Sequence, residues 1–356
     1  MLLIDAHLDL AMNALNWNRN LDLEVAEIRA AEADMQQKGR GNGTTTLSEM
    51  RRGEVFLSVV TVIKRTAHAN SPSSGDAACQ EISYAHAQGQ LAYYRVLESQ
   101  GKTRLIVDAA GLDEHVKAWQ SGGGDAPLGF ILSMEGADPI AWPEQVHSWY
   151  ADGLRQISLA HYGVSAYAHG TGTDGGLVGE AKALLREMEK TGIVLDLTHL
   201  ADQAFWEALD NFGGRVLASH NNCRALVPGG RQFTDEQIQA VISRDGVVGA
   251  ALDAWMLYPD WIKGETDPEV LTLGSVADHI DYVCQLAGDS RHAAIGSDLD
   301  GGYGTEQTPG DLDTIADLQK LVDLLHPRGY ADADVEEIFH GNWLRFFREA
   351  WSKGQS

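Results

Sequence analysis

A histidine and an aspartate two positions apart, His7 and Asp9, follow a short apolar run at residues 2–4. In an extended strand, side chains two positions apart point to the same side. An imidazole and a carboxylate would therefore project together from the end of this strand, as half of a divalent metal site. Alone, the pair has a second interpretation, a hydrogen-bonded histidine near a strand end. The rest of the chain must supply the other ligands.

The elements that would position such a site are apolar, β-rich runs that alternate with helical patterns. Eight strands are predicted, at residues 2–4, 55–63, 128–133, 154–159, 193–197, 216–218, 247–252 and 293–295. Mostly apolar strands separated by helices indicate a parallel sheet covered on both faces. Eight such units in 356 residues favour a single α/β domain, a (β/α)8 TIM barrel of the metal-dependent hydrolase type, over an open sheet or two modest domains.

Three segments of the chain remain less regular in this scheme. A ninth apolar run at residues 104–108 is either an accessory piece or a further strand. The long polar stretch at residues 11–54 predicts a loop or insertion over the barrel mouth. The glycine-rich residues 170–176 lack the Gly-Lys-Ser/Thr of a phosphate-binding loop, so they predict a plain loop, with closure over a substrate as the alternative.

Helix boundaries are also visible in the sequence. Residues 179–191 carry an apolar stripe that stops at Gly192, a residue type that commonly follows a helix. Residues 234–237, Thr-Asp-Glu-Gln, form a capping box that predicts a helix start. A further apolar stripe covers residues 276–283.

Polar groups follow six of the eight predicted strands. In this type of barrel, the chemistry lies at the C-terminal ends of the strands. Seven groups stand there, namely His7, Asp9, Glu135, His161, His199, His220 and Asp298. They exceed the three protein ligands of one open zinc site and suit two metals. Two divalent cations bring about +4, three carboxylates about −3 and a bridging hydroxide about −1, which is close to neutral.

Composition narrows the partners and the compartment. The net charge of −24 argues against nucleic acid, since phosphates require a basic surface. No run approaches the roughly 18 apolar residues of a membrane span, and no signal peptide is visible. The three widely spaced cysteines, Cys79, Cys223 and Cys284, predict reduced thiols and no cysteine zinc site. These features predict a cytoplasmic protein that binds no membrane.

Six sequence blocks, in order, resemble the signatures of the membrane (renal) dipeptidase family, the zinc dipeptidases among the amidohydrolase-like barrels. They are His7-Leu8-Asp9, Ser133-Met134-Glu135-Gly136, Asp196-Leu197-Thr198-His199, Ser219-His220-Asn221, Arg231-Gln232-Phe233-Thr234-Asp235 and Gly296-Ser297-Asp298-Leu299-Asp300-Gly301. The resemblance extends from residue 1 to about residue 347. It implies two Zn²⁺ ions and hydrolysis of dipeptides, including those with a C-terminal D-residue.

The resemblance also implies a role for each residue of the metal site. His7 and Asp9 would bind one zinc, and His199 and His220 would bind the other. Glu135 would bridge both ions. Imidazole and carboxylate ligands suit zinc, and manganese, cobalt and iron remain alternatives.

The remaining implied roles concern catalysis and substrate binding. Asp298 would be the acid/base residue, and His161 would face the tetrahedral intermediate. Ala160 and Tyr162 flank His161 where many family members have Thr and Asn, so the neighbouring subsite is expected to differ. Arg231 would anchor the substrate carboxylate, with Arg224 as its competitor.

Other functions stay open at this point. A related amidohydrolase acting on a lactam, a lactone or an N-acyl amino acid would need the same metals, and only an arginine anchor favours a free carboxylate. A non-catalytic binding or maturation protein on the same barrel is the third hypothesis. The expected partner is a small dipeptide, and a homodimer is the assembly that we consider.

Overall fold

The strands of the protein form one parallel barrel. The computed structural model describes residues 1–67, 75–122 and 126–352. The strands are β1 (Leu3–Leu8), β2 (Val55–Val62), β3 (Thr103–Leu105), β4 (Leu128–Met134), β5 (Leu154–Ser158), β6 (Val194–Asp196), β7 (Val216–Leu217), β8 (Val248–Ala250) and β9 (Ala293–Ile295). All eight predicted strands are present, and β3 is the ninth run.

Strand pairing closes these elements into the (β/α)8 barrel that the sequence predicts. The main sheet runs β1-β2-β4-β5-β6-β7 and β8 pairs with β9, all in parallel. Beside β7, the N–H of Ala218 donates to Val247 (2.9 Å) and the N–H of Gly249 donates to Ala218 (2.8 Å), which joins the two sheets. On the other side, the N–H of Asp298 donates to the carbonyl of His7 (3.2 Å), so the end of β9 meets β1.

The ninth run contains a further strand, β3, which is accessory to the ring. β3 pairs only with the first part of β4, from Thr103 opposite Leu128 to Leu105 opposite Phe130. It lies off the path of the ring because β4 pairs with β5 further along. This strand of three residues therefore pairs with the start of β4 and is not part of the barrel wall.

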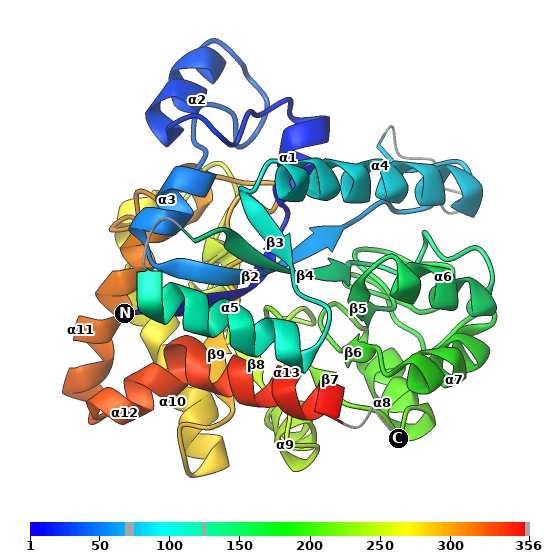
Figure 1. Ribbon diagram of the computed structural model, residues 1–356. Coiled ribbons are helices and arrows are strands. Elements are labelled where there is room, and N and C mark those ends of the chain that lie inside the picture. Colours follow the sequence, from blue (N-terminus) through cyan, green and yellow to red (C-terminus); the bar gives the residue numbers. More distant parts are fainter. Residues whose placement is uncertain (68–74, 123–125, 353–356) are drawn as a thin grey trace.

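Helices lie around the outside of the strands (Figure 1). They are α1 (Leu10–Asn16), α2 (Val25–Glu32), α3 (Leu47–Arg52), α4 (Gln80–Ser99), α5 (Ala109–Gly122), α6 (Val146–Ala151), α7 (Ala181–Thr191), α8 (Asp202–Asn211), α9 (Asp235–Ser243), α10 (Leu273–Ala287), α11 (Leu321–Leu325), α12 (Asp332–Glu336) and α13 (Asn342–Ser352). Every residue of β1, β2, β4 and β5 is buried, as expected for strands covered on both faces. Within the described part of the chain, no helix has the length and apolar character needed to cross a membrane.

The local signals for helix ends are confirmed. α7 ends where Gly192 takes a left-handed conformation with φ of 76°, which glycine adopts without steric cost. α9 begins with a reciprocal capping box between Thr234 and Gln237. The apolar stripe predicted at residues 276–283 is buried in α10.

The polar segment at residues 11–54 is richer in structure than the predicted loop. It holds most of α1 and all of α2 and α3, helices of seven, eight and six residues. A helix of about two turns contains too few apolar repeats for its periodicity to be recognised in the sequence. The segment is tied to the end of β9, since the carboxylate of Asp300 accepts the N–H groups of Thr44 (2.8 Å) and Thr45 (3.1 Å). It therefore lies beside the C-terminal ends of the strands.

Candidate metal centre

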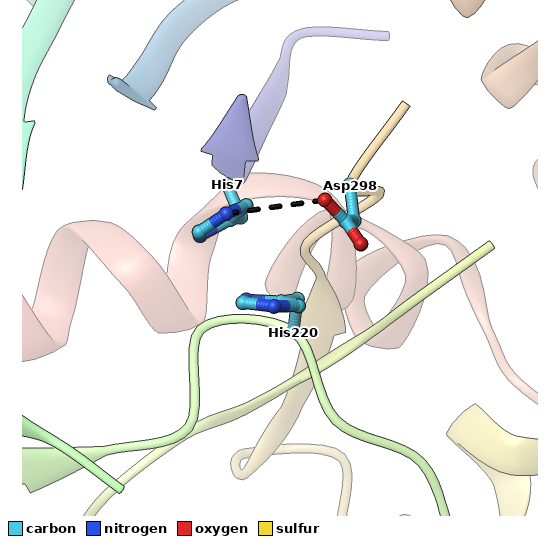
Figure 2. Close-up of side chains that lie close together, drawn as sticks. All are labelled: His7, His220 and Asp298. Carbon is cyan, nitrogen blue, oxygen red and sulfur yellow. Dashed lines mark ion pairs between the residues drawn. The ribbon is translucent and has the colours of Figure 1, made fainter. Parts of the chain in front are cut away.

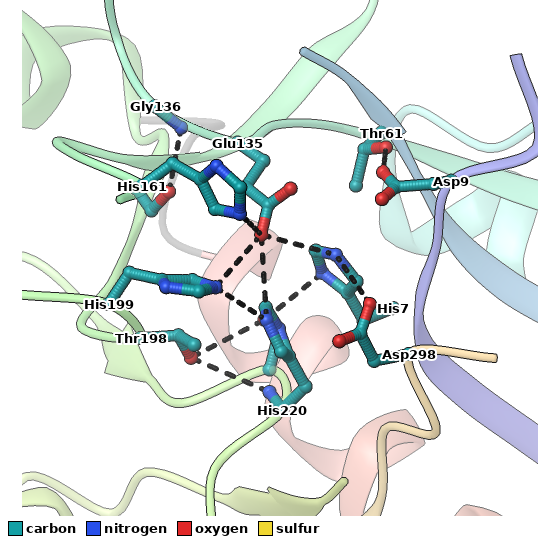
Figure 3. A network of polar contacts seen from close by, with 12 residues as sticks. His7, Asp9, Thr61, Glu135, Gly136, His161, Thr198, His199, His220 and Asp298 are labelled. Atoms are coloured by element: carbon teal, nitrogen blue, oxygen red, sulfur yellow. Dashed lines mark hydrogen bonds and ion pairs between the residues drawn. The ribbon is translucent and has the colours of Figure 1, made fainter. Parts of the chain in front are cut away.

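One oxygen of Glu135 is surrounded by histidine nitrogens. Glu135 directly follows β4, and its Oε1 lies 3.2 Å from Nε2 of His199. The Nε2 atoms of His7 and His220 are each 3.5 Å from the same oxygen, and that of His161 is 3.8 Å away. Figure 3 shows the four rings converging on this carboxylate. The structure thus brings together side chains that are up to 213 residues apart (7 to 220).

The first part of the site comes from β1. Asp5 and His7 lie two positions apart in β1, and Asp9 follows the strand as the residue that caps α1. The side chains of His7 and Asp9 come together with Glu135. The N–H of His7 donates to the carboxylate of Asp5 (3.1 Å), which fixes the backbone beside the ring. The hydroxyl of Thr61, from β2, donates to the carboxylate of Asp9. The carboxylate of Asp9 is thereby oriented by the neighbouring strand β2.

His199 and His220 supply the second part, from the loops after β6 and β7. Their Nε2 atoms lie 3.0 Å apart. The Nδ1 of His199 contacts the hydroxyl of Thr171 (2.9 Å), and the Nδ1 of His220 contacts the hydroxyl of Ser219 (2.8 Å). A partner at Nδ1 leaves Nε2 directed at the centre, an arrangement common among metal-binding histidines.

Asp298 faces these rings from the end of β9. Its Oδ1 lies 3.9 Å from Nε2 of His7, and Figure 2 shows both beside His220. Asp298 has φ of 57°, in the left-handed region that non-glycine residues seldom occupy. A Cβ added at the adjacent Gly301 would overlap the Asp298 carboxylate, so only glycine fits there. The backbone is bent here to direct this carboxylate into the mouth.

The charges at the centre are strongly coupled. Burial raises the pKa of Asp298 well above its usual range, and burial together with Glu135 raises the pKa of Asp9 to about 6. Burial acts in the same direction on Glu135, but His161 and His7 hold its pKa well below the ordinary value. Burial disfavours the charged form of His7, yet Glu135 and Asp9 raise its pKa to about 10. Three carboxylates crowded together in this way repel one another, and bound cations would relieve that repulsion.

His161 lies at the edge of the centre, in the loop after β5. Burial lowers its pKa to about 4, so the ring is neutral at pH 7. Its side chain is more exposed than those of the other three histidines. The ring of Tyr162 packs edge-on against both His161 and His199, with ring centroids 4.7 Å and 5.1 Å apart. The departure at Tyr162 thus changes the wall next to the centre.

The two candidate arginines differ in what they bind. Arg231 is buried and donates from Nη1 to Asn221 (2.6 Å) and from Nη2 to the carbonyl of His220 (2.9 Å). Its Nε is buried and has no hydrogen-bond partner among the described residues. Arg224 instead forms a two-pronged ion pair with Asp202 (2.7 and 2.8 Å).

Two buried carboxylates that sequence reasoning missed hold the strand ends together. Asp5 Oδ1 accepts the N–H of His7 (3.1 Å) and the N–H of Ser297 (2.8 Å). In the same way, Asp196 Oδ1 accepts the N–H of Thr198 (3.0 Å) and the N–H of Ser219 (3.1 Å). Each carboxylate therefore fixes two neighbouring strand ends. For Asp5, the alternation with His7 was the available signal.

The donor set fits divalent cations. Potential ligand atoms form three overlapping groups, namely His7, His220 and Asp298, then Glu135, His199 and His220, and then His7, Asp9 and Glu135. The Nε2 of His7 is buried and lacks a hydrogen-bond partner in the described part of the chain. Buried polar atoms are rarely left unpaired, so this nitrogen is suited to a metal bond. Mixed imidazole and carboxylate ligands favour zinc and similar ions.

Comparison with known proteins identifies the family of this chain. Residues 1–355 match the family described as Membrane dipeptidase (Peptidase family M19). The chain belongs to this family. Membership supports a metal-dependent hydrolase of the dipeptidase type, and it confirms the resemblance found in the sequence.

Several relatives of this family member are informative. Dipeptidase aclJ of Aspergillus oryzae is 29% identical over 246 residues, which are 68% of this chain and 55% of that protein. A protein encoded in the pqqA 5′ region of Klebsiella pneumoniae is 27% identical over 72% of this chain and 93% of its own. A Rhodobacter sphaeroides metallo peptidase, solved with a phosphinate mimic of the dipeptide L-Ala-D-Ala, has the same fold, with a TM-score of 0.78, 21% identity and 99% of each chain covered.

Proposed function

We propose that the protein is a two-zinc dipeptidase that cleaves the peptide bond of dipeptides, including those with a C-terminal D-residue. The observation that carries the proposal is the position of Glu135 Oε1, within 3.5 Å of the Nε2 atoms of His7, His199 and His220. His7 and Asp9 would hold one ion, His199 and His220 the other, and Glu135 both. Bound zinc would polarise the scissile carbonyl and lower the pKa of the attacking water.

Asp298 is proposed as the residue that moves protons. Its pKa is raised well above the ordinary range by burial, and its carboxylate lies beside His7. A carboxyl group with a raised pKa can take a proton from the attacking water and return it to the leaving amine. The N–H of Asp298 donates to the carbonyl of His7 (3.2 Å), so the backbone holds the group in place.

Arg231 is proposed to hold the C-terminal carboxylate of the dipeptide. Two of its nitrogens bind protein acceptors, while Nε has no partner among the described residues and is free to donate. The planar guanidinium suits a carboxylate. The competing Arg224 is bound through both terminal nitrogens to Asp202. We therefore place the anchor at Arg231.

His161 is proposed to face the oxygen of the tetrahedral intermediate. Its ring is 3.8 Å from Glu135 and is neutral at neutral pH, since burial lowers its pKa to about 4. A neutral imidazole that donates an N–H stabilises a developing oxyanion most in the transition state. The D-residue tolerance rests on the L-Ala-D-Ala mimic bound by the Rhodobacter relative.

A substrate panel separates this proposal from its alternatives. Zinc-loaded enzyme is given L,L- and L,D-dipeptides, N-acyl amino acids, lactams and lactones, with product detection by mass spectrometry. Dipeptide turnover at least tenfold above the other classes supports the proposal. Preferred turnover of N-acyl amino acids, lactams or lactones identifies a related amidohydrolase. Zinc absent from protein purified without chelator, together with no turnover, identifies a non-catalytic barrel.

A further inference from the structure

The glycine-rich segment at residues 170–176 lies against the candidate metal centre. The hydroxyl of Thr171 contacts Nδ1 of His199 at 2.9 Å and the carbonyl oxygen of the same residue at 3.3 Å. Thr171 and His199 are both buried. The sequence predicted a plain loop here, with closure over a substrate as the alternative, and in the structure its Thr171 contacts a candidate ligand.

The two contacts of this hydroxyl favour one tautomer of the ring. A hydroxyl has one proton to donate, and a carbonyl oxygen can only accept. When both contacts are made, the hydroxyl donates to the carbonyl of His199 and accepts from Nδ1–H, which leaves the lone pair of the ring on Nε2. Nε2 faces Glu135 (3.2 Å) and His220 (3.0 Å). Without a cation, an Nε2–H would donate to the Glu135 carboxylate, so Thr171 favours the tautomer that a bound cation requires.

The same contacts stabilise an unusual backbone conformation. His199 has φ of 69°, in the left-handed region that L-residues with a side chain seldom adopt. Such a conformation is strained and persists only where its surroundings fix it. The hydroxyl of Thr171 contacts both the carbonyl oxygen and the ring of His199, so it stabilises the backbone and the side chain of this strained residue together.

The backbone around Thr171 is also held in place by hydrogen bonds to the loop that follows β5. The N–H of Thr171 donates to the carbonyl of His161 (2.9 Å), and the N–H of Gly170 donates to Gly163 (2.8 Å). A Cβ added at Gly170 would overlap the carbonyl oxygen of His161, so the segment reaches this depth only because the residue is glycine. Thr171 thus connects His161 to His199.

We propose that Thr171 is a positioning residue that fixes His199 in its Nδ1–H tautomer and so presents Nε2 to a divalent cation shared with Glu135 and His220. The inference rests on the proposed metal-dependent function. It assigns the glycine-rich segment to the metal centre, in place of a lid over the substrate. A hydroxyl on a ligand imidazole acts through the ligand, so its removal should weaken metal binding before it affects substrate binding.

The test compares Thr171→Val, which keeps the shape and the backbone N–H, with Thr171→Ser, which keeps the hydroxyl. Zinc affinity is measured by competition with a chromophoric chelator. We expect Thr171→Val to weaken one of two zinc equivalents by about 10- to 100-fold. Thr171→Ser should remain within about threefold of wild type. Equal zinc affinity in wild type and Thr171→Val, or an equal loss in both variants, would overturn the proposal.

The neighbouring Thr173→Val is the matched control for loop stability. The hydroxyl of Thr173 donates to the carbonyl of Gly170 (2.8 Å), which its own N–H also reaches (3.1 Å). Its removal should leave zinc affinity at the wild-type value, and a loss equal to that of Thr171→Val would reduce Thr171 to a loop-stability role.

A second readout follows the ring itself. In zinc-loaded protein with ¹³C,¹⁵N-labelled histidine, the ring nitrogen shifts of His199 should report a metal-bound Nε2 and a protonated Nδ1 in wild type. At the same zinc concentration, Thr171→Val should show a larger unbound fraction of this ring. A His199 ring that binds zinc through Nδ1, or that keeps Nε2–H in zinc-loaded wild type, would contradict the inference. Wild type that binds no zinc would instead refute the proposed function, and with it the role of the ring as a ligand.

Discussion

The Nε2 atoms of His199 and His220 lie 3.0 Å apart, and both are within 3.5 Å of the same oxygen of Glu135. Burial holds the pKa of both rings well below the ordinary value, so neither ring is charged at neutral pH. Thr171 contacts Nδ1 of His199 and Ser219 contacts Nδ1 of His220. If both rings carry their proton on Nδ1, as we propose for His199, the two Nε2 lone pairs face one another, and a bound cation would accept both.

Metal removal should therefore destabilise the protein. Ligands that bind only the folded state stabilise it by about 2.7 kcal/mol at a concentration of 100 Kd. We expect zinc to raise the Tm of chelator-treated protein by several degrees and to restore hydrolysis. Differential scanning fluorimetry with added zinc measures this shift. Magnesium, which prefers oxygen ligands, is the control, and an equal response to both ions would contradict a nitrogen-rich site.

Asp298→Asn should retain zinc and lose turnover. The amide is nearly the same size but cannot take up the proton of the attacking water. Loss of a general acid or base lowers kcat by about 10²- to 10⁴-fold. Steady-state kinetics and zinc analysis on one preparation separate the two effects. Undiminished kcat would remove Asp298 from the proposed mechanism.

Arg231→Met should weaken dipeptide binding far more than it affects zinc content. Hydrogen bonds to charged groups are worth about 1.5–3 kcal/mol, so KM should rise about 10- to 100-fold. Arg224→Met is the matched control, because that guanidinium is already paired with Asp202 (2.7 Å). An unchanged KM for Arg231→Met, with a raised KM for Arg224→Met, would exchange the two assignments.

Ionisation of the buried Asp138 carboxyl should make the protein less stable at pH 8 than at pH 4. Burial raises its pKa from 3.8 to about 7. The native state then binds this proton more tightly than the unfolded chain, so stability falls as the pH rises from about 4 through 7. Asp138→Asn can still accept the N–H of Ala166 (3.0 Å) without burying a charge. Urea unfolding should show a gain of roughly 2–4 kcal/mol at pH 8 and almost none at pH 4; an equal gain at both pH values would contradict this.

Arg19→Met should strongly destabilise the segment at residues 11–54. The buried guanidinium binds Glu32 through two nitrogens (2.9 Å each) and lies 3.3 Å from Asp300. Removing one partner of a buried ion pair costs about 3–5 kcal/mol, because the remaining charges stay buried. Arg348→Met, which breaks an exposed pair with Asp113, should cost at most about 1 kcal/mol. Urea unfolding of both variants checks this, and equal losses would contradict a buried network.

The barrel and the residues at its mouth were accessible from the sequence for a simple reason. Apolar runs mark each strand, and in a parallel barrel every strand ends at the same rim. Polar groups such as Glu135, His199 and His220 stand directly after such runs, so their convergence follows once the strands are known. The short helices of residues 11–54 were not accessible, because two turns carry too little periodicity.

The sequence by itself determined the ring of strands, the family and the kind of ligand at the rim. Only the tertiary structure decided which side chains orient those ligands. Thr171 contacts His199, which lies 28 positions away in the sequence, and Asp5 accepts a hydrogen bond from Ser297, which lies 292 positions away. It also decided that Arg224 is paired with Asp202 while Arg231 keeps a free Nε. Sequence periodicity indicates which face of its own strand or helix a side chain lies on. A hydrogen bond between distant loops depends instead on the positions of both loops in the folded protein.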